Sequence, residues 1–196
     1  MMITEKAIAI STKPKETWPA VAAEQETVQS LFAGYIMPLA AIGPIASFIG
    51  LSLIGVNVFG ISYRVPVANG LVNAVVTYIL GLVGCYVSAM IASELAPNFG
   101  GSKNVVQGLK LVAYASTPVW IASVVQIFPP LAIIVLIAGL YSLYVLYLGV
   151  TPTMNVGADK QVVYTLILIV VTVVIFVIIG AVVAALRGAA GVGIGM

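Results

Sequence analysis

The sequence predicts an all-α polytopic membrane protein built as a five-transmembrane-helix bundle. Hydrophobic residues make up 62% of the chain and charged residues 7%, whereas soluble domains are about 45–50% apolar and about 25% charged. The mean hydropathy is +1.19. A chain of this composition cannot cover a water-facing surface with polar side chains, so a soluble globular domain is excluded.

The positions of the charged residues predict the number of spans. Three long stretches contain no Lys, Arg, Asp or Glu, namely residues 65–93, 111–158 and 161–186. Because one spanning helix needs about 20 residues, the middle stretch holds two spans, and the prolines that follow Phe128 divide it. An apolar run at residues 31–58 adds the first span. The predicted spans are therefore 31–58, 69–94, 105–127, 130–149 and 162–186.

The first 30 residues are predicted to be a cytosolic tail, because charged residues interrupt any apolar core of the signal-peptide type. Residues 16–35 are predicted to form an amphipathic helix in the membrane interface, with Trp18 and Tyr35 at headgroup level. The alternative for this helix is a docking surface for a cytosolic partner. The predicted domains are the tail 1–30, the membrane domain 31–187 and a flexible, Gly-rich tail 188–196.

The basic residues predict that the N-terminus is cytoplasmic. With five spans, six lysines lie on the N-terminal side of the membrane, and only Arg64 and Arg187 lie on the other. Cytoplasmic loops carry an excess of Lys and Arg, which favours the N-terminus inside and the C-terminus outside.

Several stretches together resemble one known family. The N-terminal sequence PKETWPAVAAEQ and the following LFAGYIMPLAAIGPIASFIG are similar to the entry to the Yip1 domain, as bacterial members have it. The similarity continues through ELAPNFGG, GLKLVAYASTPVW, LYSLYVLYLGVTPTM and DKQVVYT, in one order from about residue 14 to residue 186. In the run YASTPVW, eukaryotic relatives have a tyrosine–glycine–tyrosine sequence that Tyr114, Ala115 and Ser116 do not reproduce.

The resemblance implies five transmembrane helices and a cytosolic N-terminus. Eukaryotic members of the Yip1 family are associated with Rab-type small GTPases and with vesicle traffic, and their N-terminal regions are longer than the tail of this chain. The short tail and compact loops resemble prokaryotic members, which implies the cytoplasmic (inner) membrane of a prokaryote. The resemblance thus implies a fold more directly than it implies a function.

Lys110 is the basic residue that lies deepest in a predicted span. If the third helix starts near Asn104, Lys110 is about 9 Å along it, which is close enough to the headgroups for a lysine to snorkel. Glu94 ends the preceding helix on the same side, so a Glu94–Lys110 pair is expected, with Asp159 nearby. Binding of a solute or lipid headgroup is the alternative role for these charges.

Tyr114, Thr117 and Pro118 lie deeper in the same helix. Pro118 removes a backbone hydrogen bond and predicts a kink, and the hydroxyls of Ser116 and Thr117 can satisfy freed carbonyls. The kink either improves packing or lines a cavity as a hinge.

Two tyrosines of the fourth span complete the candidate site. Tyr141 and Tyr144 are three residues apart and share a face with Tyr147, so packing with internal hydrogen bonds and a substrate path are both open. In the second span Gly81 and Gly84 are expected to allow close helix approach, either within the bundle or at a homodimer seam. The candidate polar cavity or partner site comprises Glu94, Lys110, Tyr114, Thr117, Pro118, Tyr141, Tyr144 and Asp159.

No catalytic pattern occurs in the sequence. Histidine is absent, which removes the commonest general base and metal ligand, and no phosphate-binding loop is present. We therefore expect no enzyme activity, no cofactor, no metal and no nucleic-acid partner. The primary hypothesis is a non-enzymatic protein that organises the membrane or partner proteins through its bundle and cytosolic face, with the lipid bilayer, a protein partner or a second copy as partners. The alternative is a small transporter, channel or lipid-moving protein with a polar cavity near the third and fourth helices.

Overall fold

The computed structural model describes residues 3–58 and 61–189. It contains five helical segments that are long and apolar enough to cross a membrane, and an all-α bundle of five spans is thereby confirmed. The spans are Val28–Ile54, Val67–Phe99, Val105–Ile127, Pro129–Met154 and Ala158–Ala185. Residues 190–196 of the expected C-terminal tail lie outside the described residues.

The first span is made of short pieces. It runs through α3 (Val28–Leu31), the π-helix η1 (Phe32–Ile36), α4 (Met37–Ala40), α5 (Ile42–Phe48) and a second π-helix, η2 (Ile49–Ile54). A hairpin of β1 (Val56–Val58) and β2 (Ile61–Tyr63) follows it.

The other four spans are more regular. The second is α6 (Val67–Leu95) with η3 (Ala96–Phe99), and the third is α7 (Val105–Ala122) with the 3₁₀ segment η4 (Ser123–Ile127). The fourth is η5 (Pro129–Leu131) with α8 (Ala132–Met154), and the fifth is α9 (Ala158–Ala189).

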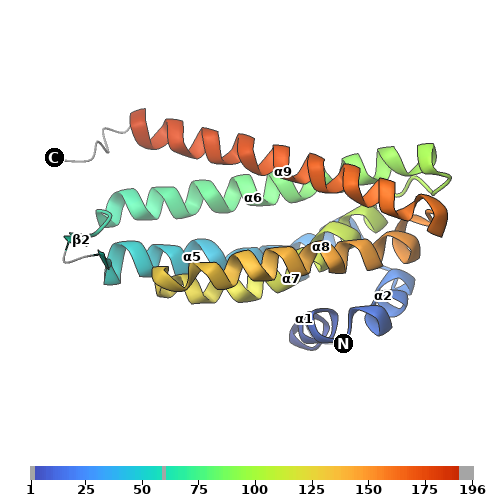
Figure 1. Cartoon of the computed structure of the whole chain (residues 1–196), viewed down its shortest axis with the longest axis horizontal. Coiled ribbons are helices and arrows are strands. Elements are labelled where there is room, and N and C mark those ends of the chain that lie inside the picture. Colours follow the sequence, from blue (N-terminus) through green and yellow to red (C-terminus); the bar gives the residue numbers. More distant parts are fainter. Residues whose placement is uncertain (1–2, 59–60, 190–196) are drawn as a thin grey trace.

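The spans form two layers that meet along α7. α6 lies against α9, while α7 lies against α8 and also contacts α6 (Figure 1). Gly108 of α7 allows the close α6–α7 approach, because a Cβ there would collide with the backbone carbonyl of Ala89. Gly84 has the same role toward α9, since a Cβ would lie 2.8 Å from Ile179.

The N-terminal segment, residues 3–27, folds differently from the single amphipathic helix expected at 16–35. It forms α1 (Ile3–Thr12) and α2 (Pro14–Ala23), and the helix stops because Glu24 is extended with φ −63° and ψ 137°. Thr27 then starts the first span with a capping box that it forms with Ser30. Trp18 and Tyr35 do not face the headgroups as expected, because their side chains are 1% and 4% exposed and pack inside the protein.

One end of the bundle collects the N-terminal segment and both short loops. α1 and α2 lie beside the loops at residues 100–104 and 155–157, opposite the β-hairpin (Figure 1). The backbone N–H of Ser102 donates to the carbonyl of Met154 at 2.8 Å, which ties the two loops together. Gly100 (φ 76°) and Asn155 (φ 55°) make these turns in the left-handed region. We call this end the charged end.

Candidate functional site

Lys110 holds the N-terminal segment on the bundle. Its side chain is fully buried, about 8 Å from the start of α7. The amine donates to the carbonyl of Val21 at 2.8 Å and to that of Glu24, and its nitrogen lies 3.9 Å from a carboxylate oxygen of Glu26. These carbonyls belong to the end of α2, where four acceptors lack a helical partner. Lys110 is thus a C-terminal cap supplied by another helix.

The expected Glu94–Lys110 pair is wrong. Glu94 forms an ion pair with Lys103 at 2.6 Å, and both side chains are more than half exposed. Lys110 points instead to the N-terminal segment, whose position could not be derived from the spacing of the spans. Asp159 is exposed in the first turn of α9. A carboxylate at this position interacts favourably with the positive end of the helix dipole.

A second lysine reinforces the attachment of the N-terminal segment. Lys6 of α1 forms hydrogen-bonded ion pairs with Glu24 and Glu26, the latter at 3.2 Å. Partial burial alone would lower the pKa of Lys6, but its hydrogen bonds to Glu24 and Glu26 outweigh burial, so the pKa lies above its ordinary value. The stabilisation by Lys6 is therefore complete at neutral pH and is lost only as the pH rises through this raised pKa.

Trp18 fills a notch in the fourth span. Its indole N–H donates to the carbonyl of Val145 at 3.0 Å. The notch exists because position 149 is glycine: a Cβ there would collide with Cζ2 of the Trp18 ring and would lie 2.6 Å from its Cε2 and 2.8 Å from Leu111. The indole thus lies directly on the backbone of α8, so that α2, α7 and α8 form one packed unit.

An aromatic cluster extends this unit to the first span. Tyr114 is fully buried, and its ring centroid lies 6.2 Å from that of Trp18 and 4.3 Å from that of Tyr35. The Tyr35 hydroxyl lies 2.8 Å from that of Thr117, whose own hydroxyl also lies 3.1 Å from the carbonyl of Ala113. Tyr35 comes from the π-helix η1, a conformation that often occurs at functional sites.

Pro118 lies inside α7, which continues past it to Ala122 and then narrows into η4. The Ser116 hydroxyl donates to the carbonyl of Val112 at 2.8 Å, in the back-bonding pattern expected beside such a proline. Pro118 itself is buried, which places it in packing rather than on a cavity wall.

Tyr141 and Tyr144 lie on α8 with their ring centroids 5.9 Å apart and their ring planes tilted by 42°. Tyr141 packs against the core that contains Tyr114, whereas Tyr144 is 43% exposed. The structure therefore does not gather the eight expected residues into one site. It brings together Lys110, Tyr114 and Thr117 with Trp18, Tyr35, Glu24 and Glu26.

A polar cleft lies elsewhere, between the two layers of the bundle. Its volume is 390 Å³, and it is walled by α5, α6, α7 with η4, and α9, with one contribution each from α4 and α8. Among the described residues that line it none is charged, and none is one of the eight expected residues. Its polar and thiol side chains are Ser47, Asn73, Thr77, Tyr78, Cys85, Ser88, Ser116, Trp120, Ser123, Gln126 and Thr172.

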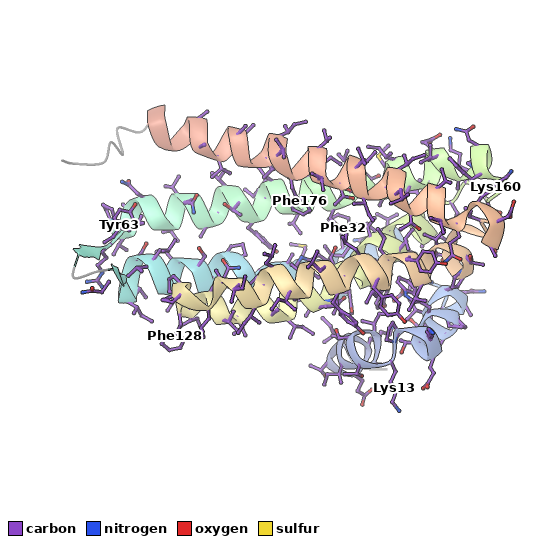
Figure 2. The ribbon with its side chains drawn as sticks, viewed as in Figure 1. Lys13, Phe32, Tyr63, Phe128, Lys160 and Phe176 are labelled. Atoms are coloured by element: carbon purple, nitrogen blue, oxygen red, sulfur yellow. The ribbon has the colours of Figure 1, made fainter. Side chains whose placement is uncertain are left out.

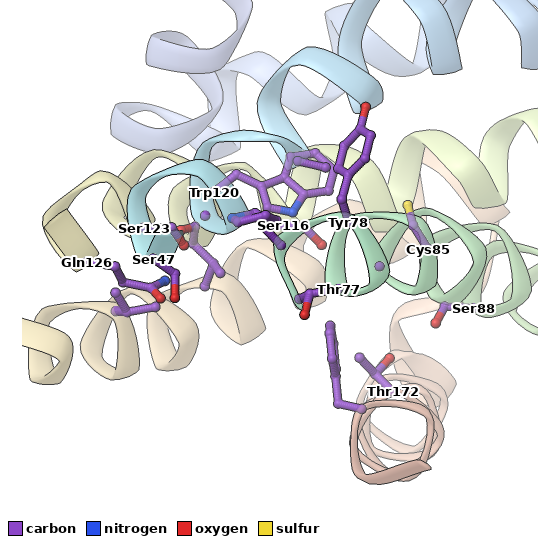
Figure 3. A pocket seen from close by; sticks show the side chains of 18 of the residues that line it. Ser47, Thr77, Tyr78, Cys85, Ser88, Ser116, Trp120, Ser123, Gln126 and Thr172 are labelled. Carbon is purple, nitrogen blue, oxygen red and sulfur yellow. Dashed lines mark hydrogen bonds between the residues drawn. The ribbon is translucent and has the colours of Figure 1, made fainter. Parts of the chain in front are cut away.

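The cleft runs along the bundle at membrane level. Figure 3 shows Ser47 and Gln126 near one end and Cys85 and Ser88 near the other, with Thr77 between them. On α7, Lys110 and Tyr114 contact the N-terminal segment and Thr117 contacts Tyr35 of the first span. Ser116 and Trp120 line the cleft. The sequence contains a pattern that could have predicted the cleft. Asn73, Thr77 and Gly81 are polar or small residues four apart in an apolar helix, so they share one face.

Metal-binding groups are not gathered in residues 3–58 and 61–189, where no cluster of three or more His, Cys, Asp or Glu side chains occurs. Cys85 is a free, buried thiol beside the cleft. The residues around Lys110 and the residues that line the cleft can form hydrogen bonds, and Lys110 also supplies a positive charge.

Comparison with known proteins agrees with this architecture. The chain is 26% identical over 151 residues to the inner membrane protein YohC of Escherichia coli K12, over 75% of this chain and 77% of that protein. YohC of Escherichia coli O6:H1 matches to the same extent. No solved structure matches the chain. The Yip1 domain family matches residues 8–181, which include α2, Lys110 and all the walls of the cleft. The five spans and this match, over most of the chain, show that the protein belongs to the Yip1 domain family.

Proposed function

We propose that this chain is a non-enzymatic membrane protein that organises partner proteins at its charged end. The supporting observation is the distribution of charge. All charged residues except Arg64 and Arg187 belong to the N-terminal segment or to the loops and helix ends beside it. Figure 2 shows Lys13 and Lys160 at this end and Tyr63 at the other.

The partner-binding face consists of exposed charges that the fold leaves on this end. Lys13, Lys15 and Glu16 are exposed on the N-terminal segment, and Asp159 and Lys160 are exposed beside the second loop. Lys110 and Trp18 hold the N-terminal segment in place, so the face is preformed rather than carried on a free tail. In this arrangement residues up to about 30 carry the partner-binding face, and the rest of the bundle supports them.

We place the charged end in the cytoplasm. The six lysines on that side favour this orientation, and the similar YohC protein is named an inner membrane protein. The proposed location is the cytoplasmic membrane of a prokaryote, with the N-terminus inside.

Cysteine labelling in intact cells tests the orientation. In a Cys85→Ser background, a Tyr63→Cys thiol should react with a membrane-impermeant maleimide, because Tyr63 is 55% exposed at the hairpin end. A Lys15→Cys thiol should react only after the membrane is permeabilised. Labelling of Lys15→Cys but not Tyr63→Cys in intact cells would reverse the proposed orientation.

Site-specific photo-crosslinking tests the partner-binding face. A photoreactive amino acid at Lys15 or Glu16 should give discrete heavier products in cells, whereas the same amino acid at Tyr63 should not give them. A Lys13→Glu, Lys15→Glu double variant, probed from Glu16, should lower the yield severalfold because the charge pattern of the face is reversed. A product of twice the chain mass would identify a second copy as the partner. The absence of position-specific products at the charged end would refute the proposal.

Movement of a small polar solute or a lipid is the second candidate function. It is favoured by the polar cleft, because polar groups inside a membrane usually face a substrate path or another polar group. The cavity was expected near the third and fourth spans. The cleft is lined by the first, second, third and fifth spans, and the fourth contributes only Val135.

A further inference from the structure

The polar cleft can be reached from the membrane. Every residue that lines it belongs to one of the five spans and none to a loop. α8 and α9 diverge toward the hairpin end (Figure 1). Val135 of α8 and Phe176 of α9 line the cleft, and Phe176 is 62% exposed. These positions describe a lateral entrance between α8 and α9, open to acyl chains.

Four polar side chains in the cleft have no partner in the protein. In the described part of the chain, the side chains of Ser47, Thr77, Gln126 and Thr172 form no hydrogen bond, and they come from four different spans. The Trp120 indole N–H is likewise free to donate. An unpaired polar group at membrane level is costly, so the cleft is matched to an occupant that both donates and accepts hydrogen bonds.

The side chains that line the cleft indicate the charge of its occupant. Among the described lining residues there is no Lys or Arg to balance an anionic headgroup and no Asp or Glu to balance a cationic one. Burying an unbalanced charge is far more costly than burying a hydroxyl. The volume of 390 Å³ is typical of small-molecule sites. It suits a small headgroup, with longer chains leaving through the entrance.

We propose that the cleft binds a lipid with a small, neutral, hydroxyl-bearing headgroup, of the diacylglycerol class. The headgroup hydroxyl and ester oxygens bond to Thr77, Thr172, Gln126 and Trp120, and the acyl chains pass between α8 and α9. Binding at the cleft is independent of partner binding at the charged end. The crosslinking experiment and the lipid experiment can therefore fail separately.

The test is binding of dioleoylglycerol to the purified full chain in detergent, measured as bound fraction by native mass spectrometry across a titration. Two ligands control for the chemistry: the same lipid with its hydroxyl acetylated, and phosphatidic acid with the same chains. Free glycerol forms a third arm and separates a lipid from a soluble polyol.

Two helical glycines supply matched protein variants. A Cβ at Gly81 meets no atom within 4 Å, and Gly81 lines the cleft, so the backbone accepts a side chain there and Gly81→Leu occupies part of the cleft. Gly180 of α9 is equally open but is not among the described lining residues, so Gly180→Leu is the control. A Thr77→Val, Thr172→Val double variant keeps the shape and removes two hydroxyls.

We expect Gly81→Leu to weaken dioleoylglycerol binding at least about tenfold, and Gly180→Leu to leave it within about twofold. The double threonine variant should weaken binding about threefold to tenfold for each lost hydrogen bond. Acetylated lipid and phosphatidic acid should bind more weakly than dioleoylglycerol to the unchanged protein. The circular dichroism spectrum and gel-filtration volume of each variant establish whether it is folded. If Gly81→Leu is not folded, the threonine variant decides the test.

Three results would overturn the inference. Equal binding of dioleoylglycerol to the unchanged protein, Gly81→Leu and the threonine variant would place the lipid outside the cleft. Equal binding of the hydroxyl-bearing and acetylated lipids would show that the polar side chains do not recognise the ligand. Binding of glycerol that Gly81→Leu abolishes, with no binding of dioleoylglycerol, would assign the cleft to a soluble polyol.

Discussion

Replacing Lys110 with methionine is expected to lower the free energy of unfolding by about 3–5 kcal/mol and to release the N-terminal segment. Methionine keeps much of the length and volume of the side chain but cannot donate to the carbonyls of Val21 and Glu24. It also removes one of the two amines beside the Glu26 carboxylate, leaving only that of Lys6. The measurement is unfolding in mixed detergent micelles, combined with limited trypsin cleavage after Lys15, since Pro14 protects the bond after Lys13.

Lys103→Met is the matched control for this prediction. Lys103 also forms an ion pair, with Glu94, but the two side chains are 57% and 56% exposed. Exposed pairs of this kind contribute about 0–1 kcal/mol. Tryptic cleavage of the N-terminal segment should therefore accelerate in Lys110→Met and stay unchanged in Lys103→Met. Equal effects of the two substitutions would show that Lys110 is not the attachment point.

Replacing Trp18 with alanine is expected to cost about 3–5 kcal/mol, because it empties the notch over Gly149. The indole is 1% exposed and also loses its hydrogen bond to Val145. Trp18→Phe keeps an aromatic ring and loses that bond, so its expected cost is nearer about 1 kcal/mol. Unfolding in mixed micelles, followed by circular dichroism, measures both variants on the same scale.

A double-mutant cycle with Gly149→Ala tests whether Trp18 acts through this notch. With Trp18 present, the new Cβ would collide with Cζ2 and Cε2 of the indole ring and should destabilise the protein. In the Trp18→Ala background only the end of the Leu111 side chain, 2.8 Å away, has to shift, and alanine favours a helix over glycine by about 1 kcal/mol. Gly149→Ala should therefore become neutral or stabilising there. If Gly149→Ala had the same effect in both backgrounds, Trp18 would not stabilise the protein through its contact with Gly149.

The five spans were predictable because a membrane imposes a simple length and composition rule. The gaps in charge divided the chain correctly, although the second and fourth spans run past their predicted ends and the first stops at Ile54, before residue 58. α8, for example, continues through Pro152 to Met154 rather than stopping near Gly149. Polar residues at the end of an apolar run do not stop a helix when they can still form backbone hydrogen bonds or pack against neighbouring residues.

The partner of Lys110 was not predictable from spacing. Sequence proximity favoured Glu94, but a lysine that is buried seeks whichever acceptors the tertiary fold brings near, and these belong to residues 21–26. The same applies to Trp18 and Tyr35, whose aromatic character is equally compatible with a headgroup belt and with a buried cluster. Burial decides between the two, and burial depends on where the N-terminal segment lies.

By itself, the sequence determined that this protein is a helical membrane protein with five spans and charges concentrated at one end, and its motifs indicated the Yip1 family. The helical spans and the charged end follow from composition and local length, and the family follows from the resemblance of the motifs. None of these needs knowledge of contacts. Only the tertiary structure decided that Lys110 caps α2, that Trp18 packs on Gly149, and that polar residues from four spans meet in one cleft. Each of these joins residues far apart in the chain, and their pairing depends on how the helices pack.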